Sequence, residues 1–246
     1  MNTSAPSSHT IWQSIGLHLI PGALITLFFY LATPALQKAG FPPMMGILLA
    51  ILFILVPFEL GYLLYESKKI SGRFSLKEVI GDQQPVVWWQ FVLITLGLIF
   101  WCGFFFVNMS TIDDYITRTF FSWLPSYFSF GLAPETASQY PAWSVRATVI
   151  AALILNGFAG PIVEEFYFRG YLLPRIPASR FWAPMINVLL FSLYHFFSPW
   201  QNITRILALI PMVYAVSWKR NIYLSMVTHC AINTIGMLGL LSLLAG

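Results

Sequence analysis

The sequence predicts an all-α fold, a polytopic transmembrane helix bundle, and three observations lead to that prediction. Of the 246 residues, 58% are hydrophobic and only 9% are charged, whereas a soluble domain has about 25% charged residues. The apolar residues form long runs, and most basic residues lie in the loops between these runs. A bilayer accommodates this much apolar surface, which a water-soluble fold of this length could not bury. We therefore expect a single membrane domain over residues 15–246, after a short cytoplasmic tail over residues 1–14.

A spanning helix needs roughly 20 mostly apolar residues, and about seven segments approach that requirement. The fifth and sixth of these segments are short, and an interfacial or re-entrant helix would raise the count to eight. In order, the predicted segments are Ile15–Leu36, Pro43–Tyr65, Val86–Met109, Ala147–Leu173, Pro184–Phe197, Ile203–Trp218 and Ile222–Leu244. The longest linker, residues 110–143, is rich in aromatic residues. We expect it to form short helices at headgroup depth outside the cell.

The charge distribution predicts the orientation of the chain. The formal net charge is +4, but the basic residues form no single patch, so we expect no nucleic-acid partner. With seven spans, three basic loops fall on one side of the membrane. Their residues are Lys68, Lys69, Arg73, Lys77, Arg175, Arg180, Lys219 and Arg220. Because basic loops stay in the cytoplasm, the N-terminus is predicted to be cytoplasmic, in a bacterial inner membrane.

The fourth apolar segment contains the sequence Glu164-Glu165-x-x-x-Arg169. Ionisable groups inside a membrane are costly, so each one is a candidate functional residue. Glu165 and Arg169 are four residues apart and share a helix face, with the acid nearer the N-terminus, which favours an ion pair. Glu164 is turned about 100° away and is expected to act as a general acid or base, although two structural carboxylates would give the same pattern. His18 and Glu59 are expected to be structural.

Two later segments carry histidines. Phe191 and His195 are four residues apart in the fifth segment, and His229 and Asn233 are four residues apart in the seventh. His229 and Asn233 can donate hydrogen bonds from one helix face, as an oxyanion hole requires. Asn187 precedes His195 by two turns and could orient it. Taken singly, each histidine is more often a structural residue, because His and Asn also join membrane helices by hydrogen bonds.

Depth in the membrane links these three segments. Their cytoplasmic ends are taken at Pro174, Pro184 and Asn221. Glu164, His195 and His229 then lie 10, 11 and 8 residues from those ends, at depths of roughly 15, 16 and 12 Å for a rise of 1.5 Å per residue. Three independent structural side chains would not be expected at one level, so the agreement favours a single site.

The set Glu164-Glu165-x-x-x-Arg169, Phe191-x-x-x-His195 and His229-x-x-x-Asn233 resembles the motifs of the CPBP family. This is the CAAX-protease and bacteriocin-processing family of intramembrane peptidases, also called the Abi family, and the resemblance covers the motif region, residues 147–238. It implies that Glu164 and His195 activate the attacking water, while His229 and Asn233 stabilise the oxyanion. Glu165 and Arg169 would support the site, and the substrate would be a peptide or protein at the membrane.

Whether a metal takes part is left open by the sequence. Glu164, His195 and His229 have side chains of the kinds that bind Zn²⁺, and a bound metal would lower the pKa of water to about 7. If all three bind zinc, the remaining general base is Glu165, which Arg169 already pairs. We therefore favour the metal-free mechanism slightly and expect no certain cofactor.

A non-proteolytic membrane protein is the alternative to a peptidase. A transporter could use Glu164 and Arg169 as a proton or ion relay, and a partner-binding scaffold could use the same buried polar residues. No internal repeat is visible, although many transporters are built from repeats. Asn233 beside His229 suits an oxyanion hole and is not needed by a proton relay. The sequence therefore favours the peptidase.

Overall fold

The computed structural model describes residues 8–244, which contain helices and connections but no strand. The all-α prediction is confirmed. Each predicted apolar segment is helical, and the third, fifth and sixth are α5 (Trp88–Asn108), α10 (Trp182–Tyr194) and α11 (Asn202–Lys219). The first segment is α1 (Ile11–Lys38), and the seventh is α12 (Tyr223–Gly236) followed by η7 (Leu238–Leu244). The second segment consists of α2 (Met44–Ala50), η1 (Ile51–Leu60) and α3 (Gly61–Ser71). The fourth consists of α8 (Ala142–Ala151), η3 (Ala152–Ala159), α9 (Gly160–Glu164), η4 (Glu165–Leu172) and η5 (Leu173–Arg175).

The first helix begins slightly earlier than the sequence predicted. Thr10 caps α1 because its hydroxyl accepts a hydrogen bond from the Gln13 N–H, and the Gln13 side chain accepts one from the Thr10 N–H. This reciprocal capping box satisfies two free backbone donors and starts the helix at Ile11 instead of Ile15. Residues 1–7 of the predicted tail lie outside the described residues.

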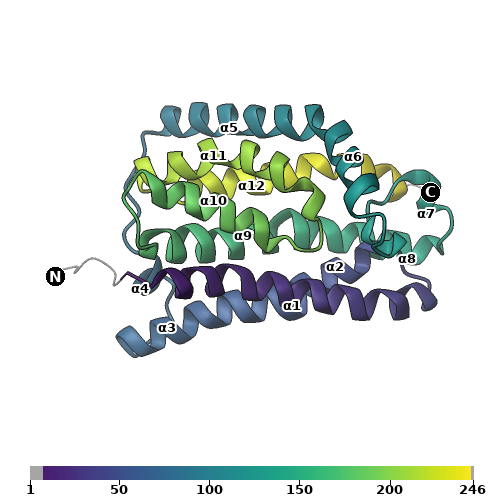
Figure 1. The fold of residues 1–246 in the computed structure, drawn as a ribbon, viewed down its shortest axis with the longest axis horizontal. Helices are drawn as coiled ribbons and strands as arrows, with labels where there is room; N and C mark the ends of the chain where they lie inside the picture. Colours follow the sequence, from purple (N-terminus) through teal and green to yellow (C-terminus); the bar gives the residue numbers. More distant parts are fainter. Residues whose placement is uncertain (1–7, 245–246) are drawn as a thin grey trace.

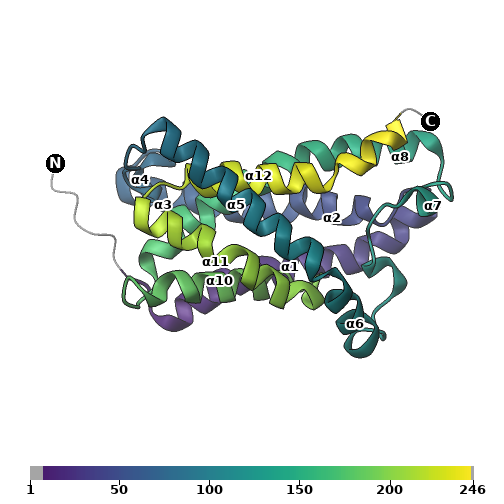
Figure 2. The same ribbon diagram turned by 90° about the horizontal axis from the view of Figure 1, so that it is seen from above.

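The helices pack side by side along one direction, as Figures 1 and 2 show. Helix α10 contacts both α1 and α11, and α5 covers α11 and α12. The segment from α8 to η5 has a central position, because it packs against α12 and also against η1. The segment that carries both predicted active-site glutamates is therefore enclosed by helices from both halves of the chain.

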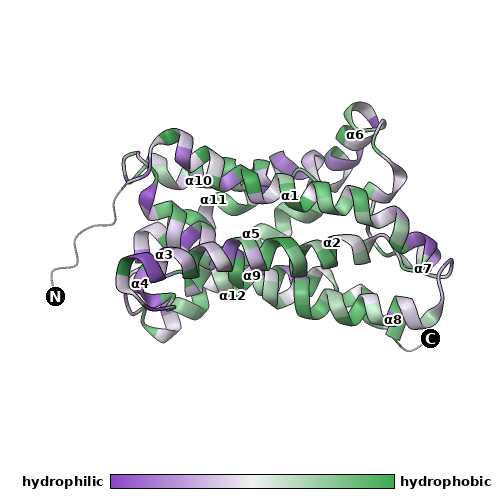
Figure 3. Cartoon of the chain, turned by 90° about the horizontal axis from the view of Figure 1, so that it is seen from below, coloured by the Kyte–Doolittle hydropathy of each residue, from purple (hydrophilic) through white to green (hydrophobic). Residues whose placement is uncertain are grey.

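The three basic loops meet at one end of the bundle, where Figure 3 shows hydrophilic residues around α3 and α4 (Lys77–Ile80). The His9 N–H donates to the Arg175 carbonyl over 2.8 Å, and Arg175 Nη1 donates to the Val79 carbonyl over 3.3 Å. The Gln84 N–H donates to the Arg220 carbonyl over 3.0 Å. The prediction that these loops share one side therefore agrees with the fold.

The predicted count of about seven spans is not confirmed. By length and hydropathy, four segments can cross a membrane, namely Ile11–Lys38, Met44–Ser71, Trp88–Asn108 and Ala142–Arg175. The pair α12 and η7, bent by 49°, gives up to a fifth span. Helix α10 has 13 residues and a length of about 20 Å, which is shorter than the hydrocarbon core of about 30 Å. The polar residues of α11, including Arg205 and Lys219, lower its hydropathy.

The linker between α5 and α8 contains short helices, as expected. These are α6 (Ser110–Phe120), η2 (Ser126–Phe128) and α7 (Pro134–Ala137). Phe128 is buried and packs edge-on against Phe29 of α1, with ring centroids 5.1 Å apart. This contact ties the linker to the bundle. The depth of these helices relative to the headgroups stays a prediction.

Close helix approach positions the end of α10. Gly22 of α1 lies directly against the backbone carbonyl of Tyr194, so that no Cβ atom would fit between the two helices. Small residues at membrane helix crossings allow backbones to approach in this way. Tyr194 is the last residue of α10, so Gly22 fixes the point from which His195 extends.

Candidate active site

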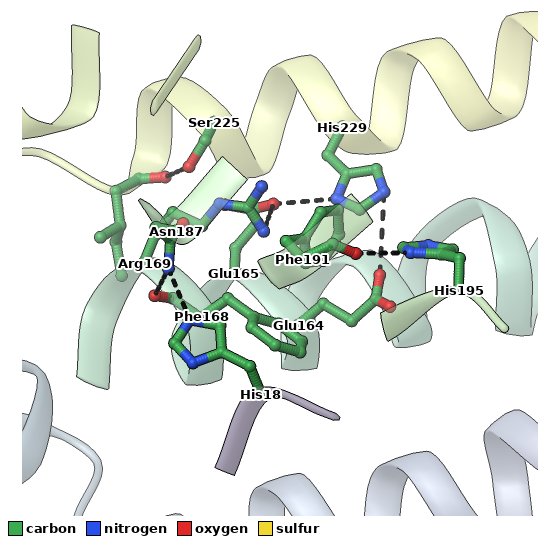
Figure 4. Close-up of polar contacts among 11 residues, drawn as sticks. His18, Glu164, Glu165, Phe168, Arg169, Asn187, Phe191, His195, Ser225 and His229 are labelled. Carbon is green, nitrogen blue, oxygen red and sulfur yellow. Dashed lines mark hydrogen bonds and ion pairs between the residues drawn. The ribbon is translucent and has the colours of Figure 1, made fainter. Parts of the chain in front are cut away.

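The predicted site residues come from three helical segments that meet inside the bundle (Figure 4). Glu164 ends α9, and Glu165 begins the π-helical turn η4, which also contains Arg169. His229 and Asn233 lie on α12. His195 follows the last residue of α10, so it caps that helix instead of lying within it as predicted. π-Helical turns occur often at functional sites, where they redirect side chains.

Glu165, Arg169 and His229 form a buried network. Arg169 Nη1 lies 3.4 Å from Glu165 Oε1, and both side chains are fully buried. The same carboxylate oxygen accepts a hydrogen bond of 2.9 Å from His229 Nδ1. The Arg169 guanidinium also stacks on the Phe191 ring, with Cζ 3.9 Å from the ring centroid. The predicted contact between Glu165 and Arg169 is therefore present, and it extends to His229.

Glu164 faces the other nitrogen of the same imidazole. Its Oε2 atom lies 3.8 Å from His229 Nε2, which is longer than a direct hydrogen bond. His229 thus lies between the two glutamates, with Nδ1 turned to Glu165 and Nε2 turned to Glu164, as Figure 4 shows. The hydrogen bond that Nδ1 donates to Glu165 fixes the orientation of the ring, so that Nε2 is turned toward Glu164.

His195 is held by its own helix end. Its Nδ1 atom donates to the Phe191 carbonyl over 2.8 Å, and its ring lies edge-on to the Phe191 ring, with centroids 4.9 Å apart. A neutral imidazole with the proton on Nδ1 has a free lone pair on Nε2. Phe191 therefore serves two residues of the site, since it orients His195 and stacks against Arg169.

One cavity joins these groups. It has a volume of about 260 Å³, and its wall includes Glu164, His195, His229 and Asn233. The Asn233 Nδ2 atom donates one hydrogen bond of 2.9 Å to the Asn156 carbonyl, which leaves its second N–H. Glu165 and Arg169 do not appear in the cavity wall. Four of the predicted site residues therefore line the cavity, and two lie behind its wall.

The predicted contact between Asn187 and His195 is wrong. The Asn187 amide instead donates to His18 Nε2 over 3.1 Å and to the Phe168 carbonyl over 3.0 Å. His18 Nδ1 donates to the Ser14 carbonyl over 2.6 Å. Because Asn187 faces α1, it joins α10 to α1 and to the motif segment. His18 is structural, as expected.

Glu164, His195 and His229, which the sequence left open as zinc ligands, are not grouped as a metal site in this structure. Among residues 8–244, no three His, Cys, Asp or Glu side chains are grouped closely enough to hold a metal ion. A zinc site with an open position needs three protein ligands that converge on one point. Nδ1 of His195 donates to a backbone carbonyl and Nδ1 of His229 donates to Glu165, which leaves Nε2 of each ring available, but the two rings and Glu164 are too far apart to hold an ion as they stand.

Residues 146–235 match the family model described as Type II CAAX prenyl endopeptidase Rce1-like. This match confirms the resemblance to the CAAX-protease family. The matched residues run from α8 to α12 and include every predicted site residue. The match supports a peptidase, which is a hydrolase, over a transporter or a scaffold. No curated protein and no solved structure matches the chain.

The fold adds residues to this CAAX-protease-like site that the sequence did not single out. Tyr194 donates a hydrogen bond of 3.0 Å from its hydroxyl to Glu59 Oε1, so the partner of Glu59 is a side chain of α10. Tyr194, Asn156 and Arg205 line the cavity together with the predicted residues. Arg205 could have been found from the sequence, because it is a charged residue within the predicted segment Ile203–Trp218, and charges within apolar segments are candidate functional residues.

Proposed function

We propose that this protein is an intramembrane endopeptidase of the CAAX-protease type, which hydrolyses a peptide bond of a membrane-associated protein or peptide. One observation carries the proposal. Glu164, His195 and His229 come from three separate helical segments and line one cavity. Burial of such groups is costly in a membrane protein, so their convergence is typical of a functional site.

In the first chemical step, Glu164 accepts a proton from a water molecule as the water oxygen attacks the carbonyl carbon of the scissile bond. Nε2 of His195 has a free lone pair and can accept a hydrogen bond from the same water, which orients the attack. The proton held by Glu164 then passes to the amide nitrogen as the C–N bond breaks. The products are a carboxylic acid and an amine, and transfer of the acid proton to the amine gives a carboxylate and an ammonium group, so the proton balance closes without another reactant.

The negative charge of the tetrahedral intermediate needs hydrogen-bond donors near the carbonyl oxygen. Asn233 has one N–H beyond the hydrogen bond that it donates to Asn156. His229 has Nε2 turned toward Glu164 and the cavity, and it donates from this atom when the ring carries a second proton. We assign the oxyanion to these two side chains.

Glu165 and Arg169 act through His229. Glu165 holds the imidazole by the bond to Nδ1, and Arg169 places an opposite charge 3.4 Å from this buried carboxylate. They are positioning residues, because neither appears in the cavity wall. This explains why two adjacent glutamates have different roles.

Features of the same structure support a proposed substrate class and location. The wall of the cavity is mostly apolar, which suits a peptide with apolar side chains or a lipid-modified protein tail. The three basic loops lie at one end of the bundle, and the positive-inside rule assigns that end to the cytoplasm. The first described residues, which contact Arg175, are then cytoplasmic. A bacterial inner membrane is the proposed location.

The test is Glu164→Gln in protein reconstituted into lipid nanodiscs, assayed with a library of membrane-anchored peptides. We expect cleavage to fall by about 100- to 10,000-fold, since the amide cannot accept the proton from water, while the folded fraction stays close to that of the parent. Glu135→Gln is the matched control, because Glu135 is exposed on α7 and its change should leave cleavage intact. A Glu164→Gln variant with parental activity would remove Glu164 from the mechanism.

A further inference from the structure

Arg205 is a second buried arginine, and it lines the cavity together with Glu164, His195 and His229. It lies in the first turn of α11, ten residues after His195 along the chain. The mechanism above gives it no role. A cation at this depth is costly to bury, so the partners of its guanidinium decide what it does.

All three acceptors that the guanidinium contacts are neutral. Nη1 donates to Asn202 Oδ1 over 3.1 Å, and Nη2 donates to Ser198 Oγ over 2.9 Å and to Gln201 Oε1 over 3.3 Å. Within residues 8–244, ion pairs with N–O distances of up to 4.0 Å form at Lys69, Arg169 and His229, and none forms at Arg205. The guanidinium charge is therefore uncompensated by a close carboxylate of the described chain.

Asp113 of α6 is also buried near Arg205, but it forms no ion pair with it. Its Oδ1 atom instead accepts a hydrogen bond of 2.6 Å from the hydroxyl of Thr204, the residue before Arg205. A guanidinium has five N–H donors, and the three hydrogen bonds above use three of them. Two donors remain for another group, and the side chain borders the cavity.

We infer that Arg205 binds a carboxylate of the peptide substrate, close to the scissile bond. A carboxylate can accept a charge-assisted hydrogen bond from either of the two remaining donors, which are Nε–H and one N–H of Nη1. It would also supply the opposite charge that the described residues do not place beside this guanidinium. The carboxylate comes either from the C-terminus of the substrate or from an Asp or Glu side chain near the cleaved bond. This inference rests on the proposed function, because it adds substrate specificity to the same cavity.

The experiment measures binding separately from cleavage. The probes are N-acetylated tetrapeptides of Leu, Ile and Val, made once with a free C-terminal carboxylate and once as the C-terminal amide. A third set is amidated and has one internal Asp, and a fourth has Asn in its place. Binding is measured in nanodiscs on the Glu164→Gln background, so that no probe is consumed.

With Arg205 intact, we expect the matching carboxylate probe to bind about 10- to 100-fold more tightly than its neutral counterpart, since hydrogen bonds to charged groups are strong. A preference for the free C-terminus identifies a C-terminal carboxylate, and a preference for Asp over Asn identifies an acidic side chain. Adding Arg205→Gln should remove the preference, and Arg205→Lys should restore part of it. Arg118→Gln, at an exposed arginine of α6, is the control and should preserve the preference.

Equal binding of charged and neutral probes, or a preference that survives Arg205→Gln, overturns the inference. A purely structural role would lower the melting temperature of Arg205→Gln without changing the ratio of the two dissociation constants. The proposed function fails in a different way. In that case the parent cleaves no peptide of the membrane-anchored library, whatever the outcome of the binding experiment.

Discussion

Two buried arginines lie near the same pair of histidines, and their surroundings differ. Arg169 is paired with the Glu165 carboxylate and stacks on Phe191, behind the cavity wall. Arg205 borders the cavity and contacts neutral oxygen atoms only. The first cation completes an internal network, whereas the second has capacity for a further partner. A buried charge is therefore informative about function only once its partners are known.

The largest expected effect is on the free energy of unfolding, which should fall more for a substitution of Arg169 than for one of Arg205. Arg169→Met removes the partner of a fully buried carboxylate, which typically costs about 3–5 kcal/mol. Arg205→Met removes a charge whose acceptors are neutral, so we expect a smaller loss, of about 1–3 kcal/mol. Thermal unfolding of both variants in nanodiscs measures the difference.

The double variant Arg169→Met with Glu165→Gln sharpens this comparison, because it removes both charges together. It should be more stable than Arg169→Met alone, since no unpaired carboxylate remains. An Arg169→Met variant as stable as the parent would show that the ion pair does not hold this region together.

The second expected effect is on the catalytic rate and follows from Glu165, the ion-pair partner of Arg169. Glu165→Gln keeps an oxygen that can accept from His229 Nδ1 but removes the charge beside it. We expect kcat to fall by about 10- to 100-fold, as for other residues that orient a ligand or an acid–base group, while KM changes little. Steady-state kinetics on a peptide that the parent cleaves gives both values. A large rise in KM at unchanged kcat would instead place Glu165 in substrate binding.

The smallest expected effect is on stability and follows from Ser198, which accepts a hydrogen bond from Arg205. Ser198→Ala removes one of the three neutral acceptors of the guanidinium and should cost about 1.5 kcal/mol. Because the charge remains, the preference for a carboxylate probe should persist. Thermal unfolding and the binding ratio are measured on the same sample. A loss of the preference with no loss of stability would mean that the Ser198 hydroxyl, and not the guanidinium, selects the ligand.

Much of the site was predictable from the sequence because helical periodicity is a local rule. The spacing of four residues placed Glu165 with Arg169 on one face and left Glu164 on another, and both contacts follow that pattern. The apolar runs located every long helix, since a bilayer requires continuous hydrophobic segments.

Contacts between distant helices were not predictable in the same way. We expected Asn187 to orient His195 because both residues lie in one predicted segment. In the structure α1 packs against α10, and Asn187 forms its hydrogen bond with His18 instead. Glu59 and Tyr194 meet across 135 residues of sequence, and no local spacing connects them. The count of spans is not confirmed, because α10 is too short and α11 too polar to pass as a span by length and hydropathy.

The early end of α10 affects how the bilayer meets the protein. Beyond Tyr194 the chain stays non-helical until Pro199, and irregular backbone is tolerated at membrane depth only where protein or water surrounds it. A helix of this length also leaves about 10 Å of a hydrocarbon core uncovered. The bilayer beside α10 therefore has to become thinner, which places lipid headgroups and solvent deeper at this point. The same short helix that presents His195 therefore shortens the apolar layer that water has to cross to reach the cavity.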